Sequence, residues 1–241
     1  MAPATIRIPA RFNGPPGSAN GGYACGLVAG AMGVDSAEVT LRSPPPLETE
    51  LRLESHRQRI SVHDGDTLVA EGRPTVVALR LLEPVEPAQA AAAARAGSER
   101  WAAAHPFPSC VVCGPERQPG DGLRLFPGPL GDEGNFACDW TPDASLADGH
   151  GAVRPEYVWA ALDCPTSAPI GNHGEGPPLV LARLSASLDA PVLAGEPHAI
   201  VSWGLAAGGR KRTAGAALFD AGGRPLAHAR ALWIELSADS G

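Results

Sequence analysis

The sequence predicts an α+β fold made of two similar halves, each an antiparallel sheet around one central apolar helix. Two observations carry this prediction. A series of strand-like segments and turns occurs twice along the 241 residues, and an apolar helical segment precedes each series. The composition agrees, because 44% hydrophobic and 19% charged residues suffice for a packed core. Since only 5% are aromatic, small side chains fill the interior and elements can approach closely.

The first helical segment spans residues 21–32 and has the sequence GGYACGLVAGAM. It carries no charge on any face, so we expect it to be buried all round. Strand-like stretches follow at residues 39–41, 51–53, 60–62 and 68–73. The turn Asp64-Gly65-Asp66 separates the last two, which is typical of an antiparallel hairpin.

A connector divides the chain into comparable halves. The proline-spaced stretch 83–87 is followed by the alanine tract 90–94, a composition typical of a linker that is helical in part. We therefore assign residues 1–85 to an N-terminal half, 86–104 to the connector and 105–241 to a C-terminal half.

The second half repeats the order of the first. Its helical segment spans residues 155–162, where Pro155 suits the first helical position and Glu156 complements the positive end of the helix dipole. Strand-like stretches follow at residues 184–188, 199–201, 216–219 and 226–230, with a turn at 220–223. The same series twice favours gene duplication over a chance likeness between two hairpin series.

The net charge, the hydropathy and the first residues of the sequence argue against several classes of partner and location. The formal net charge of −7 argues against binding to nucleic acid, and no apolar run approaches the roughly 20 residues needed to cross a bilayer. Residues 1–5 lack the charged start and apolar run of a signal peptide. We expect a cytoplasmic protein with no membrane partner, whose five cysteines are reduced.

Four segments carry a family resemblance: residues 12–23 (FNGPPGSANGGY), 110–115 (CVVCGP) with 121–125 (DGLRL), 158–165 (VWAALDCP), and the closing hairpin from Arg210 to Trp233. In these the sequence resembles thioesterase-like, double-hotdog members of the hotdog superfamily. The resemblance implies a central helix in each half, the halves paired as a pseudo-dimer, and acyl-CoA sites at their seam. It also implies a small acyl thioester as partner, no cofactor, and a homodimer of double hotdogs.

Asp163 is the candidate catalytic carboxylate. Thioester hydrolysis needs a base or nucleophile near the carbonyl and donors for the developing oxyanion. In hotdog thioesterases these are usually a helix carboxylate and an amide at a helix N-terminus. Asp163 ends an apolar helix, and Pro165 suggests that it lies in the last turn, where burial and the helix dipole would raise its pKa. The alternative is a structural carboxylate bonded to nearby backbone.

Gly21 and Gly22 are the candidate amide donors, facing across the seam to a carbonyl near Asp163, with Asn20 as a further polar contact. Alternatively, the glycines only allow close helix packing. Because residues 21–32 contain no acid or histidine, only one of the two pseudo-symmetric sites would be catalytic. His150, before Gly151, matches the His-Gly pair of many relatives; otherwise it is a surface-loop residue.

Candidate substrate contacts come from aromatic and basic residues. Tyr23 and Trp159 lie on the two helical segments. Matching hairpin tips carry basic residues that could bind coenzyme A phosphates, because arginine pairs bidentately with phosphate. These are Arg57, Arg59, Arg210, Lys211 and Arg212. Alternatively, the tips are simply solvated.

Cys110 and Cys113 form one Cys-x-x-Cys pair. A closed zinc site needs four ligands, and the remaining candidates, His105, Cys138 and Cys164, are scattered through expected strands and a helix end. A redox pair would need a thioredoxin-like setting, which is missing. We therefore expect a structural role and no metal, hence no stoichiometric zinc.

Together these features favour a hydrolase of acyl-CoA or related acyl thioesters at the seam. The alternative is a non-catalytic hotdog module that binds an acyl-CoA or lipid-like ligand, or serves assembly. A hydratase would need an Asp/His pair that we do not find, and Ser18, Thr166 and Ser167 lack the context of a serine hydrolase.

Overall fold

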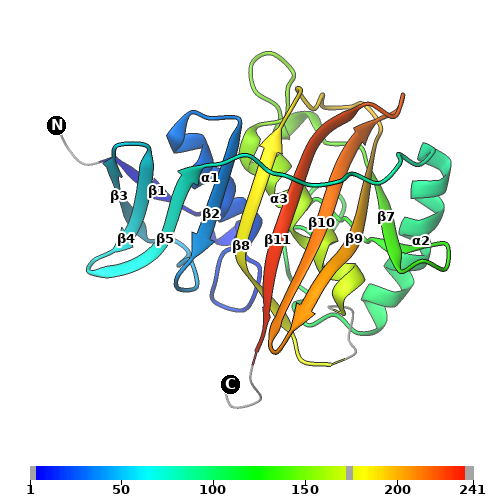
Figure 1. Cartoon of the computed structure of the whole chain (residues 1–241), viewed down its shortest axis with the longest axis horizontal. Helices are drawn as coiled ribbons and strands as arrows, with labels where there is room; N and C mark the ends of the chain where they lie inside the picture. The colour runs from blue at the N-terminus through cyan, green and yellow to red at the C-terminus, as the bar shows by residue number, and fades with distance from the viewer. Residues whose placement is uncertain (1–3, 172–175, 237–241) are drawn as a thin grey trace.

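A computed structural model of the protein describes residues 4–171 and 176–236 (Figure 1). Its helices are α1 (Gly21–Met32), α2 (Pro87–Ala103) and α3 (Pro155–Ser167). The strands are β1 (Thr5–Arg7), β2 (Ser36–Leu41), β3 (Glu50–His56), β4 (Arg59–Asp64), β5 (Thr67–Pro74), β6 (Gly128–Leu130), β7 (Asn135–Trp140), β8 (Leu179–Leu188), β9 (His198–Gly208), β10 (Lys211–Asp220) and β11 (Pro225–Glu235). Short 3-10 helices span Ala10–Phe12, Ala144–Leu146 and Ala168–Ile170.

The sheet repeats one topology. Its strand order is β1-β3-β4-β5-β2-β8-β11-β10-β9-β7-β6, and neighbouring strands are antiparallel. Outward from the centre, β2-β5-β4-β3-β1 matches β8-β11-β10-β9-β7. In each half the helix follows the outermost of these strands in the chain, α1 after β1 and α3 after β7. The hairpin series predicted twice from the sequence is confirmed.

The expected two separate sheets are one continuous sheet. Strands β2 and β8 pair from Ser36 with Ser187 to Thr40 with Arg183, which joins the halves edge to edge. This junction satisfies backbone groups that would otherwise be exposed on two open edges. Figure 1 shows β2 beside β8, with α1 and α3 on the same face of the sheet. The half boundaries at 85/86 and 104/105 stay a prediction, although α2 fills most of the expected connector.

Helix α1 has the predicted bounds, whereas α3 continues past the expected end at Leu162. Pro165 lies inside α3, so Asp163 is followed by a further turn and does not end the helix. Two hydroxyls satisfy carbonyls of the last turn: Thr166 Oγ1 donates to the Asp163 carbonyl at 2.6 Å, and Ser167 Oγ donates to the Cys164 carbonyl at 2.8 Å. These bonds and the complete burial of the turn outweigh the helix-breaking tendency of proline.

Helices α1 and α3 pack with their backbones in close approach. A methyl group on Gly22 would lie 2.3 Å from Asp163 Cβ, and one on Gly26 would lie 2.5 Å from Glu156 Cα. Such contacts require glycine at both positions of α1. The seam between the halves is therefore a helix–helix interface beneath the β2–β8 junction.

Two long connections cross the molecule. After β5 the chain runs over the outer face of the sheet to α2, which packs against β6 and β7 at the far edge (Figure 1). After α2, the irregular segment 104–127 returns towards the first half, where the amide of Val111 donates to the Asn13 carbonyl at 2.9 Å. None of the helices in the described part of the chain has the length and hydropathy needed to span a membrane.

Candidate functional site

Asp163 of α3 binds the N-terminus of α1 across the seam. Its Oδ2 accepts hydrogen bonds from the amide of Gly22 at 2.8 Å and from Asn20 Nδ2 at 2.9 Å. Asn20 is the N-cap of α1, and its Oδ1 accepts a bond from the amide of Tyr23 at 2.9 Å. The first amides of a helix are unpaired and its N-terminus favours negative charge, which explains this contact.

The carboxylate is buried, with the residue 1% exposed. Its second oxygen, Oδ1, has no hydrogen-bond partner among the described residues. Burial raises the pKa of Asp163 to about 7, helped by the charge of Cys110 and opposed by the bonds from Gly22 and Asn20. The site thus holds a desolvated carboxylate with one bonded and one unbonded oxygen.

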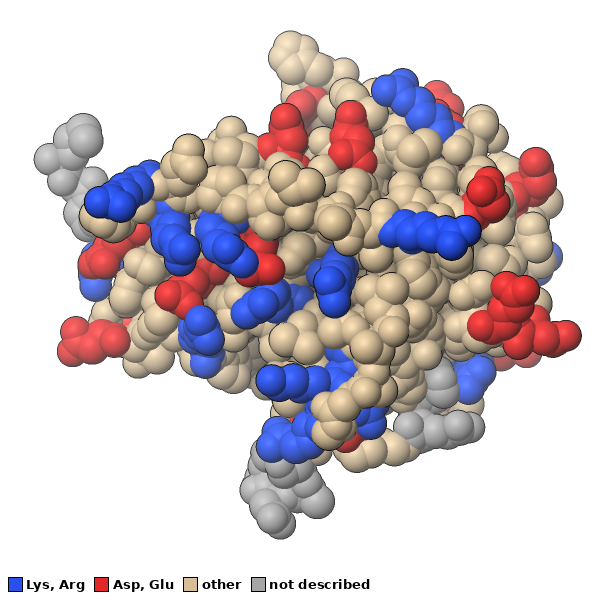
Figure 2. Space-filling view, in the orientation of Figure 1, with Lys and Arg blue, Asp and Glu red and all other residues tan. Residues whose placement is uncertain are grey.

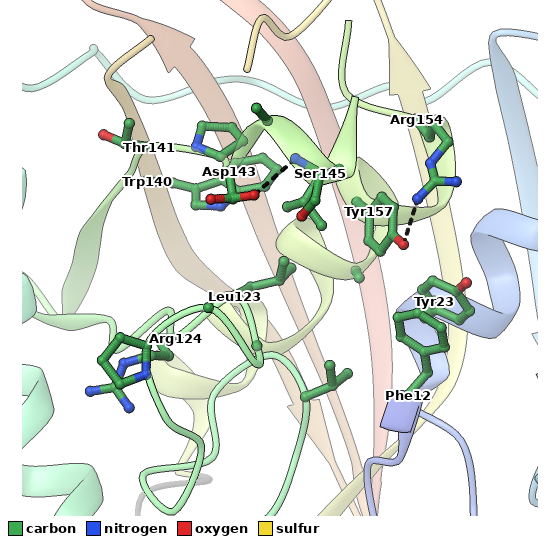
Figure 3. Close-up of a pocket in the computed structure, with 18 of the residues that line it drawn as sticks. Phe12, Tyr23, Leu123, Arg124, Trp140, Thr141, Asp143, Ser145, Arg154 and Tyr157 are labelled. Atoms are coloured by element: carbon green, nitrogen blue, oxygen red, sulfur yellow. Dashed lines mark hydrogen bonds between the residues drawn. The ribbon is translucent and has the colours of Figure 1, made fainter. Parts of the chain in front are cut away.

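A cavity of about 590 Å³ lies near the contact between Asp163 and the N-terminus of α1 (Figure 3). One wall is aromatic: Phe12 stacks on Tyr23 with ring centroids 4.1 Å apart, and Tyr157 lies tilted against both. Asp163 does not line the cavity, but Ala160, one helical turn earlier, does. Tyr23, the neighbour of Gly22 in α1, also lines it. Asp163 therefore lies one helical turn from one residue of the cavity wall and bonds the chain neighbour of another.

Arginines supply positive charge around the cavity. Arg11, Arg124 and Arg154 line it, and Figure 3 shows the last two on opposite sides. Arg154 donates to the Tyr157 hydroxyl at 2.8 Å and stacks over its ring. A cavity with an aromatic wall and several cations suits a ligand with an apolar part and an anionic part.

The structure brings only some of the sequence-predicted residues together. Asn20, Gly22 and Asp163 meet, and Tyr23 lines the cavity. Gly21 lies against Leu181, 2.9 Å from the position a methyl group would take. Trp159 is buried in the α1–α3 interface.

The other candidates lie outside the cavity. His150 is in an exposed turn, where its amide donates to Asp148 at 2.8 Å. At the β9–β10 turn, Arg210 donates to the Glu235 carbonyl at 3.0 Å, and Arg212 pairs with the Glu235 carboxylate. Neither these residues nor Lys211 line the cavity. Arg57 and Arg59, at the β3–β4 turn, do not line it either.

Sequence reasoning missed most of the cavity lining. Further lining residues are Arg11, Phe12, Val111, Leu123, Arg124, Trp140, Asp143, Leu146, Arg154 and Tyr157. Phe12, Val111, Leu123 and Arg124 lie in segments of family resemblance, and Tyr157 lies within the predicted second helix. Those positions were the available signals, but no local pattern indicates that they meet one another and residues 140–146 around one cavity.

A cluster of cysteines also contacts the Asn20 side chain. The Sγ atoms of Cys110, Cys113 and Cys164 all lie within 4.8 Å of one another, with 3.8 Å between those of Cys110 and Cys164. His105 Nε2 lies 3.2 Å from Cys113 Sγ. The expectation that these candidates are scattered is wrong for His105 and Cys164, because segment 104–127 folds back against α3. Cys138, buried in β7, is not a member of the cluster.

Comparison with solved structures identifies the fold. A tesB protein from Mycobacterium avium subs paratuberculosis is 14% identical, with 97% of this chain and 92% of that chain covered and a TM-score of 0.62. A candidate thioesterase II from Thermobifida fusca is 12% identical over the same shares, with a TM-score of 0.61. The chain has the hotdog fold of thioesterase-like proteins.

A third structure, a candidate thioesterase from Novosphingobium aromaticivorans, is 15% identical, with 97% of this chain and 95% of that chain covered and a TM-score of 0.59. No protein-family model and no curated protein matches the sequence. At these identities the likeness concerns the fold alone. The repeated strand order in this chain gives two hotdog halves, with α1 and α3 as their central helices.

Proposed function

We propose that this protein hydrolyses acyl thioesters at the seam between its hotdog halves, with Asp163 as the catalytic carboxylate. The observation that supports the proposal is the pairing of a buried carboxylate in one half with the amide-bearing helix terminus of the other. The pair joins residues 141 positions apart, so each half supplies one part of the chemistry. The names of the structural neighbours point to the same coarse activity.

In the proposed mechanism, the acyl group lies along the aromatic wall and the thioester carbonyl reaches the amide of Gly22. The carbonyl oxygen takes the hydrogen bond that Asp163 Oδ2 now accepts. A helix N-terminal amide stabilises the negative charge that develops on that oxygen. Because Asp163 is 1% exposed, the side chains of Tyr23 and Ala160 must move apart before the substrate carbonyl can replace Asp163 at the Gly22 amide.

The displaced Asp163 carboxylate then activates water. Asp163 removes a proton as the water oxygen bonds to the carbonyl carbon, and the carbon–sulfur bond breaks as the tetrahedral intermediate collapses. The leaving thiolate takes the proton from Asp163, and the products are a carboxylic acid and a thiol. Direct attack by the carboxylate, through an anhydride that water hydrolyses, gives the same products.

We further propose a coenzyme A ester as the substrate. The support is charge: Arg11, Arg124 and Arg154 outnumber Asp143, the single acidic residue among the described residues that line the cavity, and arginine binds phosphate bidentately. Arg11 also pairs with Asp121 at 3.5 Å and Arg154 with Glu156 at 3.6 Å, so a phosphate would compete with these carboxylates. The hairpin-tip residues Arg210 and Arg212 contact Glu235 outside the cavity, so they give this proposal no support.

A non-catalytic acyl-thioester-binding module is the second candidate. It is favoured by the hydrogen bonds themselves, because Asp163 already accepts those of Gly22 and Asn20 and lies outside the cavity lining. In this function the carboxylate only clamps α1 to α3, and the cavity binds a ligand without turnover.

Asp163→Asn separates the two functions. The amide oxygen can still accept both bonds from α1, while the base is lost. Against a panel of acyl-CoA thioesters, we expect hydrolysis to fall roughly 100-fold or more with the melting temperature preserved. Asp139→Asn, which changes an exposed carboxylate of β7, is the matched control and should retain full activity.

Three results would reject the catalytic assignment. Asp163→Asn could hydrolyse as fast as the parent, or it could fail to fold, which makes the carboxylate structural. If the parent and the variant both bind acyl-CoA in calorimetry without hydrolysing it, the binding module is correct.

A further inference from the structure

The cysteine cluster has the composition and spacing of a thiolate metal site. Cys110 and Cys113 come from segment 104–127 and Cys164 comes from α3, and all three are buried. We propose that these three cysteines bind one zinc ion. The proposal reverses the sequence-based expectation of no metal, and it does not depend on whether Asp163 is catalytic.

The sulfur positions suit tetrahedral zinc. With Zn–S bonds of about 2.3 Å, ligand sulfurs in a tetrahedron lie about 3.8 Å apart. The Sγ atoms of Cys110 and Cys164 are 3.8 Å apart, and the other two pairs lie within 4.8 Å. A shift of the Cys113 sulfur by up to about 1 Å, which a small change in its side-chain torsion can produce, would complete the tetrahedral arrangement of the three sulfurs.

Hydrogen-bond donors already point at the sulfurs. Asn20 Nδ2 lies 3.8 Å from Cys110 Sγ and 3.7 Å from Cys164 Sγ. His105 Nδ1 accepts the amide of Phe107 at 2.8 Å, so its proton is on Nε2, directed at Cys113 Sγ. Donors of this kind stabilise metal-bound thiolates and tune the site, whereas neutral buried thiols need none.

The backbone around the pair is a tight knuckle. The amide of Gly114 donates to the Cys110 carbonyl at 2.9 Å, and a methyl group on Gly114 would lie 2.5 Å from that oxygen. The turn directs both thiols of the Cys-x-x-Cys pair to one side. Segment 104–127 has no helix or strand, and such long irregular segments in a compact domain usually have a special role or constraint.

The proposed ion would join three parts of the site. It would tie segment 104–127 to α3, and its thiolates would hold the Asn20 side chain that also bonds Asp163. Three thiolates leave one coordination position for water or for a reoriented His105. In the structure as described, His105 acts as a hydrogen-bond donor to the ligand Cys113.

Metal analysis of the purified full chain tests the proposal. We expect about one zinc ion per chain by elemental analysis. Metal-free protein loaded with Co²⁺ should show thiolate-to-cobalt charge-transfer absorption and the intense visible bands of a tetrahedral ion. Cys110→Ala, Cys113→Ala and Cys164→Ala should each lose the stoichiometric metal. Cys138→Ala, which removes a buried thiol outside the cluster, is the matched control and should keep it.

His105→Ala tests the donor role. The variant should retain one metal ion with affinity lower by about 10–100-fold, the usual effect of removing a hydrogen bond to a metal ligand. If the alanine variants of the cysteines do not fold, an alkylation experiment on the parent protein takes the place of the variants. Under mild denaturation, zinc should then protect Cys110, Cys113 and Cys164 from a thiol reagent and should not change the reactivity of Cys25 and Cys138.

The proposal is overturned if the parent binds neither zinc nor cobalt stoichiometrically after reduction. It is also overturned if Cys138→Ala loses metal as Cys164→Ala does, or if zinc protects all five cysteines equally. Because the readout is metal content, loss of hydrolysis in Asp163→Asn neither supports nor weakens it.

Discussion

Gly26→Ala tests the close approach of α1 and α3 on which the candidate site depends. An added methyl group at Gly26 would lie 2.5 Å from Glu156 Cα, 2.9 Å from Trp159 Cβ and 3.1 Å from the Glu156 carbonyl oxygen. Two of these three neighbours are backbone atoms, which cannot rotate away. Gly30→Ala, in the same helix with no neighbour within 4 Å, is the matched control.

The expected magnitude follows from two opposing effects. Alanine is favoured over glycine inside a helix by roughly 0.5–1 kcal/mol, and this gain applies to both variants. At Gly26 the methyl group must move from 2.5 Å to a normal carbon–carbon separation of about 3.5–4.0 Å, which separates the two helices by about 1 Å. Overpacking of this kind costs about 1–3 kcal/mol.

We therefore expect Gly30→Ala to raise the free energy of unfolding slightly and Gly26→Ala to lower it by about 0.5–2 kcal/mol net. Urea denaturation followed by tryptophan fluorescence would measure both midpoints. Because α3 carries Asp163, hydrolysis or ligand binding should also weaken in Gly26→Ala. Equal midpoints for the two variants would show that the helices tolerate separation and would refute the close-packing argument.

Two further predictions concern buried polar contacts. Thr166→Val should lower the free energy of unfolding by about 1–3 kcal/mol, because Trp233 Nε1 donates to Thr166 Oγ1 at 2.8 Å and would be left unpaired; Thr166→Ser should restore most of it. Glu38→Gln should cost roughly 0.2–1 kcal/mol near neutral pH, since Glu38 of β2 pairs with Arg73 and, across the seam, with Arg183. Burial alone would raise the pKa of Glu38, but its arginine partners lower it overall. A carboxylate whose pKa is lower in the folded state stabilises the fold at pH values above its unfolded-state pKa, and this stabilisation is lost as the pH falls through the folded-state pKa. In acid unfolding curves, the difference in stability between the parent and Glu38→Gln should therefore vanish.

Local patterns in the sequence determined the central helix and four of the strands of each half, whereas β1, β6 and β7 were not predicted. Helix α1 has its predicted bounds because its signals are adjacent: Asn20 caps the start, and Gly33 ends it with φ of 64°. The hairpins are likewise set by short-range alternation and turns. Helix α3 shows the limit of this reasoning, because Pro165 indicates a helix end while buried packing and two hydroxyl bonds carry the helix to Ser167.

One contact of the candidate site was also predictable. Asn20, Gly22 and Asp163 were expected to meet across the seam, and the structure brings them together. The sequence could not indicate that the Asp163 carboxylate would itself accept the hydrogen bond of the Gly22 amide. That contact depends on a helix separation set by Gly22 and Gly26, which no local pattern specifies.

Only the tertiary structure decided the single sheet, the cavity lining and the cysteine cluster. The β2–β8 pairing joins strands from opposite halves, and Asn20 meets Cys164 across 144 residues. Local propensity acts over a few residues, whereas these contacts form only when the whole chain closes around its core. Segment 104–127 is the clearest case, because it has no periodic pattern of its own and its position follows from what it packs against.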